Sequence, residues 1–254
     1  MFRQIRYFKS IVCLTILPFL FSSFRTPHKV KNEMTTGQGF AVVELFTSEG
    51  CSSCPPADEA VGRLDRGKKN LFVLSFHVDY WNNLGWKDKY SDPAYSGRQK
   101  EYGTYFHLDN IYTPQIVVNG KTEFVGSNET QLKETIQASL AETPTAEISL
   151  KVLQETNHKI PVTFISDGNA GLKLNLALVQ NFAKDFVQRG ENKGRTLSHF
   201  FIVRDFKVLP NQKGSNTFYL DVPADLSSSQ CSVVAYLQNT NNGHIVAATG
   251  SSIP

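Results

Sequence analysis

Two cysteines separated by two residues constrain the fold of this chain more than any other feature. Cys51 and Cys54 lie within residues 50–56, Gly-Cys-Ser-Ser-Cys-Pro-Pro. Residues 40–47 (FAVVELFT) precede them with the pattern of a buried strand, and residues 56–66 follow with apolar side chains on one helical face. The pair therefore lies at a junction between a strand and a helix. The chain of 254 residues is long enough for one large domain or two medium ones.

The segment from residue 39 to residue 143 continues this alternation of strands and helices. The strand predicted over 71–78 (LFVLSFHV) is apolar on both faces, as in a parallel sheet. The further predicted elements are a helical stretch near 95–105 within a long connection over 79–112, strands over 115–119 and 122–125, and a helix over 128–142 that opens with a capping box. We therefore predict an α/β domain over residues 39–143.

After Pro144 the pattern changes to strands that follow one another with only turns between them. The predicted strands are 146–153, 160–165, 172–179, 199–206, 217–222, 232–238 and 245–249. Short strands at this spacing are typical of an antiparallel β-sandwich. We therefore predict a second domain, a β-sandwich over residues 144–254.

A Cys-x-x-Cys pair between the first strand and helix of an α/β pattern is typical of a thioredoxin-like redox motif. Two intervening residues bring the sulfurs within bonding reach, and a helix N-terminus favours thiolate over thiol. Because only the thiolate attacks a disulfide, Cys51 is predicted to attack and Cys54 to resolve the mixed disulfide. These two residues are the predicted catalytic pair, and the reaction needs no cofactor.

A Thr-Pro sequence at the start of the third predicted strand supports the same interpretation. In thioredoxin-like folds a Thr-Pro with a cis peptide bond at this place lies against the cysteine pair. Its backbone can pair with an extended substrate chain. Thr113 and Pro114 are therefore predicted to bind substrate.

The residues that follow the second strand are further candidates, because ligands of open α/β sheets bind outside the carboxyl ends of the strands. Asp79, Tyr80, Trp81 and Trp86 are predicted to bind substrate or transfer protons. The alternative is structural: the tryptophans would form a hydrophobic cluster under a long loop, and His77 would hydrogen-bond Asp79. Both interpretations stay open at this point.

Four other roles for the cysteines compete with exchange. The pair could be a structural disulfide, half of a metal site, a copper-carrier site with a nearby histidine, or a partner of Cys231. A four-ligand zinc site needs a second Cys/His pair, and none occurs at zinc-finger spacing, so no metal is assigned. Cys231 is expected to be a lone buried cysteine. Glu49 and Asp58, which flank the pair, are expected to face solvent, and residues 189–195 are expected to form a charged hairpin or an interdomain contact.

Several segments together resemble a known family. They are residues 43–58 (VELFTSEGCSSCPPAD), 77–81 (HVDYW), 85–88 (GWKD), 98–99 (RQ), 112–115 (YTPQ), 117–120 (VVNG) and 189–199 (RGENKGRTLSH). Over about residues 40–250 the chain resembles the secreted, thioredoxin-like proteins grouped as domain-of-unknown-function family 1223. The resemblance implies a thioredoxin-like domain followed by a β-rich domain and implies no established reaction.

The sequence also departs from ordinary thioredoxins. Gly50 replaces the tryptophan before their first cysteine, and Leu45 takes the place of their buried aspartate. Glu44 is one residue away and should therefore point to the opposite face of the strand. Pro55 and Pro56 suggest that the helix itself begins near Pro55, because proline is tolerated in a first helical turn.

The N-terminus has the pattern of an export signal. Residues 1–23 carry three basic residues and then an apolar run over 11–21, too short to span a bilayer comfortably. These basic residues account for the whole formal charge of +3, so the rest is neutral and has no electrostatic footprint for nucleic acid. Residues 24–38 form a polar tether. We expect a periplasmic or secreted protein that contacts membrane only through its N-terminus, which anchors the chain if it is not cleaved.

The sequence therefore favours a thiol–disulfide oxidoreductase that acts on extracytoplasmic proteins with thiols or disulfides. The alternative is a non-enzymatic binding module in which the Cys51–Cys54 disulfide holds a loop together.

Overall fold

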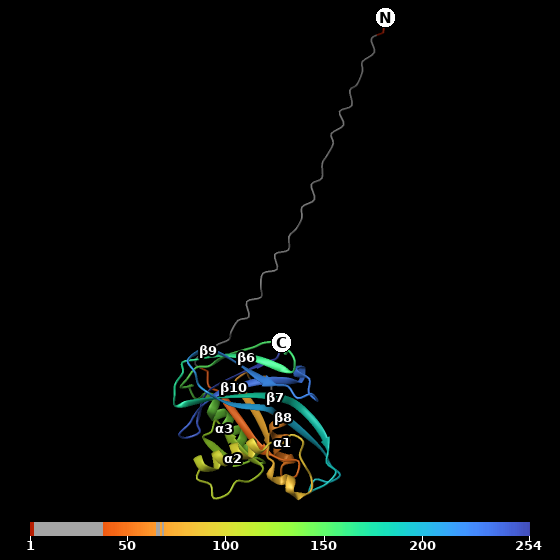
Figure 1. Ribbon diagram of the computed structural model, residues 1–254, viewed down its shortest axis with the longest axis vertical. Helices are drawn as coiled ribbons and strands as arrows, with labels where there is room; N and C mark the ends of the chain where they lie inside the picture. The colour runs from red at the N-terminus through yellow and green to blue at the C-terminus, as the bar shows by residue number, and fades with distance from the viewer. Residues whose placement is uncertain (3–37, 65–66, 68) are drawn as a thin grey trace. The chain divides into compact units, whose positions relative to one another are not determined.

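The computed structural model describes residues 1–2, 38–64, 67 and 69–254 (Figure 1). The predicted signal peptide (1–23) and tether (24–38) lie almost wholly outside the described residues. Residues 38–254 belong to one compact unit. Across the described ranges, no helix combines the length and the apolar character needed to cross a bilayer.

The half of the chain before Pro144 alternates strands with helices. Its elements are β1 (Ala41–Thr47), α1 (Pro55–Gly62), β2 (Leu71–His77), the 3-10 helix η1 (Tyr80–Leu84), α2 (Pro93–Tyr105), β3 (Gln115–Val118), β4 (Thr122–Val125) and α3 (Glu129–Ala141). Each strand and helix predicted over 39–143 is present. Helix α1 begins at Pro55 as predicted, because the two prolines occupy positions where a backbone N–H is not needed, but it ends at Gly62 rather than near residue 66.

The half after Pro144 consists of strands and one short 3-10 helix. Its elements are β5 (Ser149–Val152), β6 (Lys159–Ser166), β7 (Leu172–Phe186), β8 (Thr196–Pro210), β9 (Gly214–Asp221), η2 (Ser228–Gln230), β10 (Cys231–Asn239) and β11 (Ile245–Ser252). All seven predicted strands are found. Strands β7 and β8 are much longer than predicted, because their outer halves alternate exposed and half-buried side chains and lack a continuous apolar run.

A single sheet of eight strands joins the two halves in the order β11-β10-β7-β8-β2-β1-β3-β4 (Figure 1). Strand β1 runs parallel to β2 and antiparallel to β3, and β2 meets β8 through the parallel pair Ser75 and Ile202. A second sheet has the order β5-β6-β9. The predicted mixed α/β class is confirmed. The predicted boundary near Pro144 falls between elements, but strands from both sides of it share the large sheet.

Three hydrophobic clusters cover the two faces of the large sheet, since successive strand residues point to opposite faces. On one face, side chains of β1 and β2 pack with Tyr95 and Tyr102 of α2 and with side chains of β7, β8 and β10. On the other face, α1 and α3 cover β1–β4, while β5, β6 and β9 cover β7, β10 and β11. The sheet is thus buried on both faces, which explains the nearly continuous apolar runs of β1 and β2.

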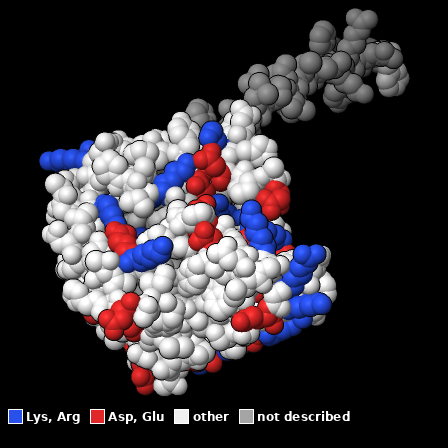
Figure 2. Space-filling view, turned by 60° about the horizontal axis from the view of Figure 1, so that its bottom comes forward, with Lys and Arg blue, Asp and Glu red and all other residues white. Residues whose placement is uncertain are grey.

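The surface carries both signs of charge. On the face that Figure 2 presents, acidic and basic side chains lie beside one another among uncharged residues. This mixture agrees with the near-neutral formal charge of the chain outside its N-terminal segment.

Candidate functional site

The two cysteines form a disulfide at the junction between β1 and α1. Cys54 is the N-cap residue of α1, and Cys51 lies in the preceding turn, where its backbone N–H donates to the carbonyl of Ser48 at 3.2 Å. Both cysteines are fully buried. The pair therefore has the predicted place in the chain, but it is covered by other residues of the protein.

The cover is the β7–β8 loop, residues 187–195. The side-chain amide of Asn192 donates to the carbonyl oxygens of Glu49 and Cys51, each at 2.9 Å. The backbone N–H of Ser52 donates to the Glu191 carboxylate at 3.0 Å. The sequence predicts a hairpin or an interdomain contact for the charged segment 189–195, and both are found: it connects the antiparallel strands β7 and β8 and contacts the first half of the chain.

Trp81 packs against the disulfide loop and bonds the Thr113–Pro114 segment. The peptide bond of this segment is cis, as predicted. The indole N–H of Trp81 donates to Thr113 Oγ1 at 2.8 Å, and a Cβ atom added to Gly50 would lie 2.9 Å from Trp81 Cβ. Gly50 thus makes room for Trp81, where a larger residue before Cys51 would collide with it.

The predicted substrate-binding residues divide into two groups. Trp81 contacts the disulfide loop and bonds Thr113, Pro114 packs near Ala57 of α1, and the Trp86 indole donates to Glu49 Oε2 at 2.6 Å. Asp79 and Tyr80 instead bond side chains of α2, where Asp79 accepts from the Ser96 hydroxyl at 2.5 Å and the Tyr80 hydroxyl donates to Gln99 at 3.2 Å. The predicted bond between His77 and Asp79 is wrong, because Ser96 occupies the Asp79 carboxylate.

The sequence missed a buried group of five side chains close to the disulfide, called here the acid–histidine cluster. Its members are Glu49, Asp58, His77, Asp88 and His199. Each is at most 3% exposed. The expectation that Glu49 and Asp58 face solvent is therefore wrong, because strand β8 places His199 against both carboxylates.

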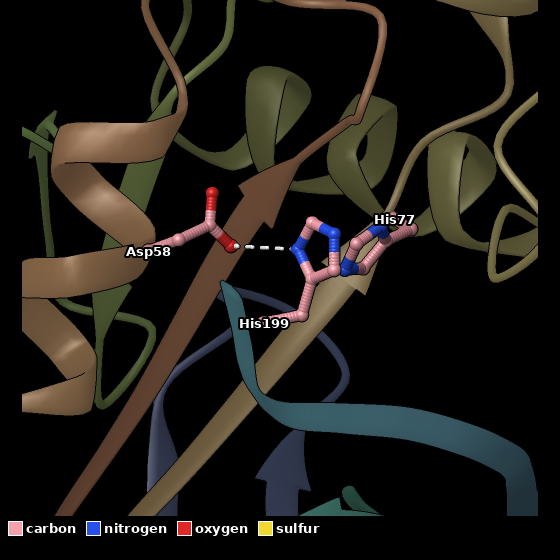
Figure 3. Close-up of side chains that lie close together, drawn as sticks. All are labelled: Asp58, His77 and His199. Carbon is pink, nitrogen blue, oxygen red and sulfur yellow. Dashed lines mark ion pairs between the residues drawn. The ribbon is translucent and has the colours of Figure 1, made fainter. Parts of the chain in front are cut away.

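Each histidine of the cluster lies within 4 Å of a carboxylate. His77 Nδ1 lies 2.6 Å from Asp88 Oδ2. His199 Nε2 lies 3.3 Å from Glu49 Oε1, and His199 Nδ1 lies 3.7 Å from Asp58 Oδ1. Figure 3 shows Asp58 of α1 and His199 of β8 directed toward each other, with His77 at the end of β2 beside them.

Burial and neighbouring charges shift the pKa values of His199 and Asp88 in opposite directions. Burial alone would lower the pKa of His199, but the Asp58 and Glu49 carboxylates raise it to about 10. Burial alone would raise the pKa of Asp88, but the His77 imidazole and two backbone N–H donors hold it below its usual range. A buried group with a perturbed pKa beside a disulfide is a functional-site candidate on physical grounds.

A second buried polar network lies on the opposite face of β1. Leu45 packs toward α1, and Glu44 points toward α2, as predicted from strand alternation. The Arg98 guanidinium donates to Glu44 Oε1 at 2.7 Å, and the hydroxyls of Tyr102 and Tyr236 also donate to this carboxylate. These contacts join β1, α2 and β10. Position 45, where ordinary thioredoxins are expected to have a buried aspartate, is a leucine.

Cys231 is free of disulfides among the described residues, and it is buried at the start of β10. Burial raises the pKa of this thiol to about 11. A thiol with such a pKa is almost entirely protonated at neutral pH, so Cys231 is a poor nucleophile. It is the lone buried cysteine that the sequence predicted.

A cavity of about 550 Å³ lies away from the disulfide, between the start of β5 and the end of β6. Its lining includes Phe40, Ile148, Ile165 and Ala247. No residue of the acid–histidine cluster or of the disulfide loop lines it. It is therefore a separate hollow of the surface.

Comparisons with known proteins give a family and a structural neighbour. The family model described as "Protein of unknown function (DUF1223)" matches residues 42–238. The chain is similar to the crystal structure of an Agrobacterium tumefaciens protein solved by structural genomics. The two are 26% identical with a TM-score of 0.64 over 83% of this chain and 92% of the other. No curated protein matches.

Proposed function

The chain belongs to the DUF1223 family, whose description assigns no reaction, and we propose that its Cys51–Cys54 pair exchanges thiols and disulfides with extracytoplasmic protein substrates. In the reducing direction, the Cys51 thiolate attacks a substrate disulfide, a mixed disulfide forms, and one substrate sulfur leaves as a thiolate. Cys54 then attacks Cys51 Sγ, which releases the second substrate thiolate and re-forms the Cys51–Cys54 disulfide. Oxidation of a substrate dithiol is the same sequence in reverse.

The observation that carries this proposal is the place of the disulfide. It follows the end of a central strand and includes the N-cap of a helix, and Trp81, which packs against the same loop, bonds Thr113 of the cis Thr113–Pro114 peptide. A helix N-terminus favours thiolate on the adjacent cysteine. The backbone beside a cis proline can align an extended substrate with the sulfurs.

We further propose that residues 39–143 are a thioredoxin-like domain and that residues 144–254 are a β-sandwich domain that contributes to the same sheet. The first part of this proposal is supported by parallel pairing of β1 with β2, antiparallel pairing of β1 with β3, and helices on both faces. The second is supported by the apolar cluster between β5, β6, β9 and strands β7, β10 and β11.

Burial of the disulfide favours a second candidate, a non-enzymatic binding module in which this disulfide is structural. Both cysteines are inaccessible while Asn192 and Glu191 hold the β7–β8 loop in place. The cavity near β5, which apolar and polar side chains line together, would then be the place for a ligand. Exchange therefore requires that the β7–β8 loop opens, and the binding-module function does not.

Trapping of mixed disulfides distinguishes these candidates. In the full chain with Cys54→Ser, Cys51 has no resolving partner. We expect its thiolate to attack a disulfide of a model protein such as insulin and to stay bound to that protein as a mixed disulfide. Cys51→Ser with Cys54 intact should form far less, and Cys231→Ser should react like the unsubstituted chain. Absence of any adduct at Cys51 under non-denaturing conditions would contradict exchange and support the structural disulfide.

A further inference from the structure

The acid–histidine cluster concentrates buried polar atoms that lack hydrogen-bond partners among the described residues. They are Glu49 Oε1, Asp58 Oδ1, His77 Nε2 and both ring nitrogens of His199. Buried polar atoms are almost always paired, so several unpaired ones in one place require an explanation. Thiol–disulfide exchange does not supply one, because the proposed reaction assigns no role to either histidine.

His77 is the most informative member. Its Nδ1 lies 2.6 Å from the Asp88 carboxylate, which itself accepts from the backbone N–H groups of Glu49 and Tyr90. A carboxylate at this distance fixes the proton on Nδ1 and leaves the Nε2 lone pair free. Histidines that bind metals are held in the same way, with the second nitrogen donating to a carboxylate.

His199 also lies between two carboxylates, but its contacts are longer than that of His77 and neither ring nitrogen forms a hydrogen bond. Its Nε2 lies 3.3 Å from Glu49 Oε1, and Glu49 is held in turn by the Trp86 indole. Its other nitrogen, Nδ1, faces Asp58 Oδ1 at 3.7 Å. Asp58 is oriented by the Thr47 hydroxyl, which donates to Oδ2 at 2.8 Å and leaves Oδ1 unpaired.

We propose that Asp58, His77 and His199 bind a divalent transition metal ion, and that Zn²⁺ is the ion they fit best. Two imidazoles and one carboxylate, with a fourth position left for water, form a common zinc ligand set. Asp88 and Glu49 are the supporting carboxylates behind the two imidazoles. The ion also offsets two of the three negative charges that the buried carboxylates Glu49, Asp58 and Asp88 carry when ionised.

The spacing of the ligand atoms agrees with such a site after a small adjustment. The ligand atoms of Asp58, His77 and His199 lie within 4.8 Å of one another. Ligands at about 2.1 Å from a tetrahedral zinc ion lie about 3.4 Å apart. The side chains therefore need to close by little more than about 1 Å, which rotations about their side-chain bonds can supply. A protonated His199 between Glu49 and Asp58 is the metal-free alternative, but it leaves His77 Nε2 unexplained.

Zinc titration of the full, chelator-treated chain in its disulfide form tests the proposal. We expect one Zn²⁺ per chain, and more than about 100-fold weaker binding in His77→Gln and His199→Gln. Asp88→Asn should weaken binding about 10- to 100-fold, because it removes only the supporting carboxylate. The matched control His107→Asn alters an exposed histidine and should bind like the unsubstituted chain.

Two additional measurements distinguish zinc binding at this site from misfolding of a variant and from zinc binding by the cysteines. Each variant is compared by circular dichroism, and zinc should raise the melting temperature of the unsubstituted chain but not of His199→Gln. The double variant Cys51→Ser/Cys54→Ser should retain zinc binding. No bound zinc in the unsubstituted chain, equal binding in folded His77→Gln, or loss of binding with the two cysteines would each overturn the proposal.

Discussion

At the scale of single residues, Glu44 and Arg98 form an ion pair in the interior of the protein. Both side chains are almost inaccessible to solvent, and the Glu44 carboxylate accepts hydrogen bonds from the arginine and from two tyrosine hydroxyls. A buried pair contributes little net stability compared with apolar residues, but removing one partner leaves an uncompensated charge. The pair therefore makes β1, α2 and β10 dependent on one another.

Replacement of Arg98 tests this dependence. Arg98→Ala should lower the free energy of unfolding by about 3–5 kcal/mol, because the Glu44 carboxylate stays buried without its cation. Urea unfolding at neutral pH measures the change. Arg63→Ala is the control, since Arg63 pairs with Glu59 and Glu129 in solvent and should leave the unfolding midpoint nearly unchanged. Equal effects of the two substitutions would contradict this account.

The sequence predicted some of these residue positions and missed others for a physical reason. Strand alternation within β1 was enough to place Leu45 and Glu44 on opposite faces, because it depends only on local backbone geometry. Burial of Glu49 and Asp58 depends on His199, which reaches them from β8 far along the chain. No local pattern reports such a contact, although the run of residues 189–199 in the family resemblance marked the segment.

At the scale of elements, close packing between α1 and the loops around β4 fixes the disulfide relative to Pro114. A Cβ atom added to Gly126 would lie 2.9 Å from Ala57 Cβ, 3.1 Å from Pro114 Cβ and 3.2 Å from Leu45 Cδ1. The two Cβ atoms are attached to the backbone and cannot move without shifting the helix or the proline loop. Glycine at position 126 therefore permits the approach.

Gly126→Ala should lower the free energy of unfolding by about 1–3 kcal/mol because the added methyl overpacks this contact. The control is Gly97→Ala in the exposed part of α2, where nothing lies within 4 Å of the added methyl. That substitution should raise stability by about 0.5–1 kcal/mol, since alanine is the better helix former. Thermal and urea unfolding of both variants measure the difference. A Gly126→Ala variant as stable as Gly97→Ala would show that the contact is loose.

The β7–β8 loop is the second element on which the proposed function depends. Asn192→Ala removes two hydrogen bonds to the carbonyls of Glu49 and Cys51, each worth roughly 1 kcal/mol. We expect the Cys51–Cys54 disulfide to react about ten- to thirtyfold faster with a phosphine reductant. Asn242→Ala, in an exposed turn between β10 and β11, should leave the rate unchanged. An unchanged rate in Asn192→Ala would mean that other contacts limit access to the disulfide.

At the scale of the whole molecule, the two halves of the chain share a sheet and a core. The cluster around α2 includes Phe46 and Phe76 from the first half and Val203, Val234 and Tyr236 from the second. The sequence predicted nearly every element but not that the two halves share a sheet. Strands β2 and β8 meet through a single residue pair, and no sequence pattern indicates that pairing. The sequence also underestimated the lengths of β7 and β8. Their outer halves pair with neighbouring strands but lack the apolar periodicity by which a strand is predicted.

The shared core predicts that both halves unfold together. Both tryptophans, Trp81 and Trp86, precede Pro144, so their fluorescence reports the first half. Hydrogen exchange of the amides of Val234 and Tyr236 reports β10 in the second half. We expect the same urea midpoint from both probes. Loss of β10 protection at a clearly different urea concentration would show that the halves are energetically independent.

The most direct test of the central claim is the reduction potential of the Cys51–Cys54 disulfide. It is measured in the full chain carrying Cys231→Ser, in glutathione and dithiothreitol buffers of defined ratio. Exchange-active pairs have potentials at or above about −270 mV, whereas structural disulfides lie below about −300 mV. We expect a potential above about −270 mV. A potential well below about −300 mV would contradict exchange and leave a disulfide that only holds the loop between β1 and α1.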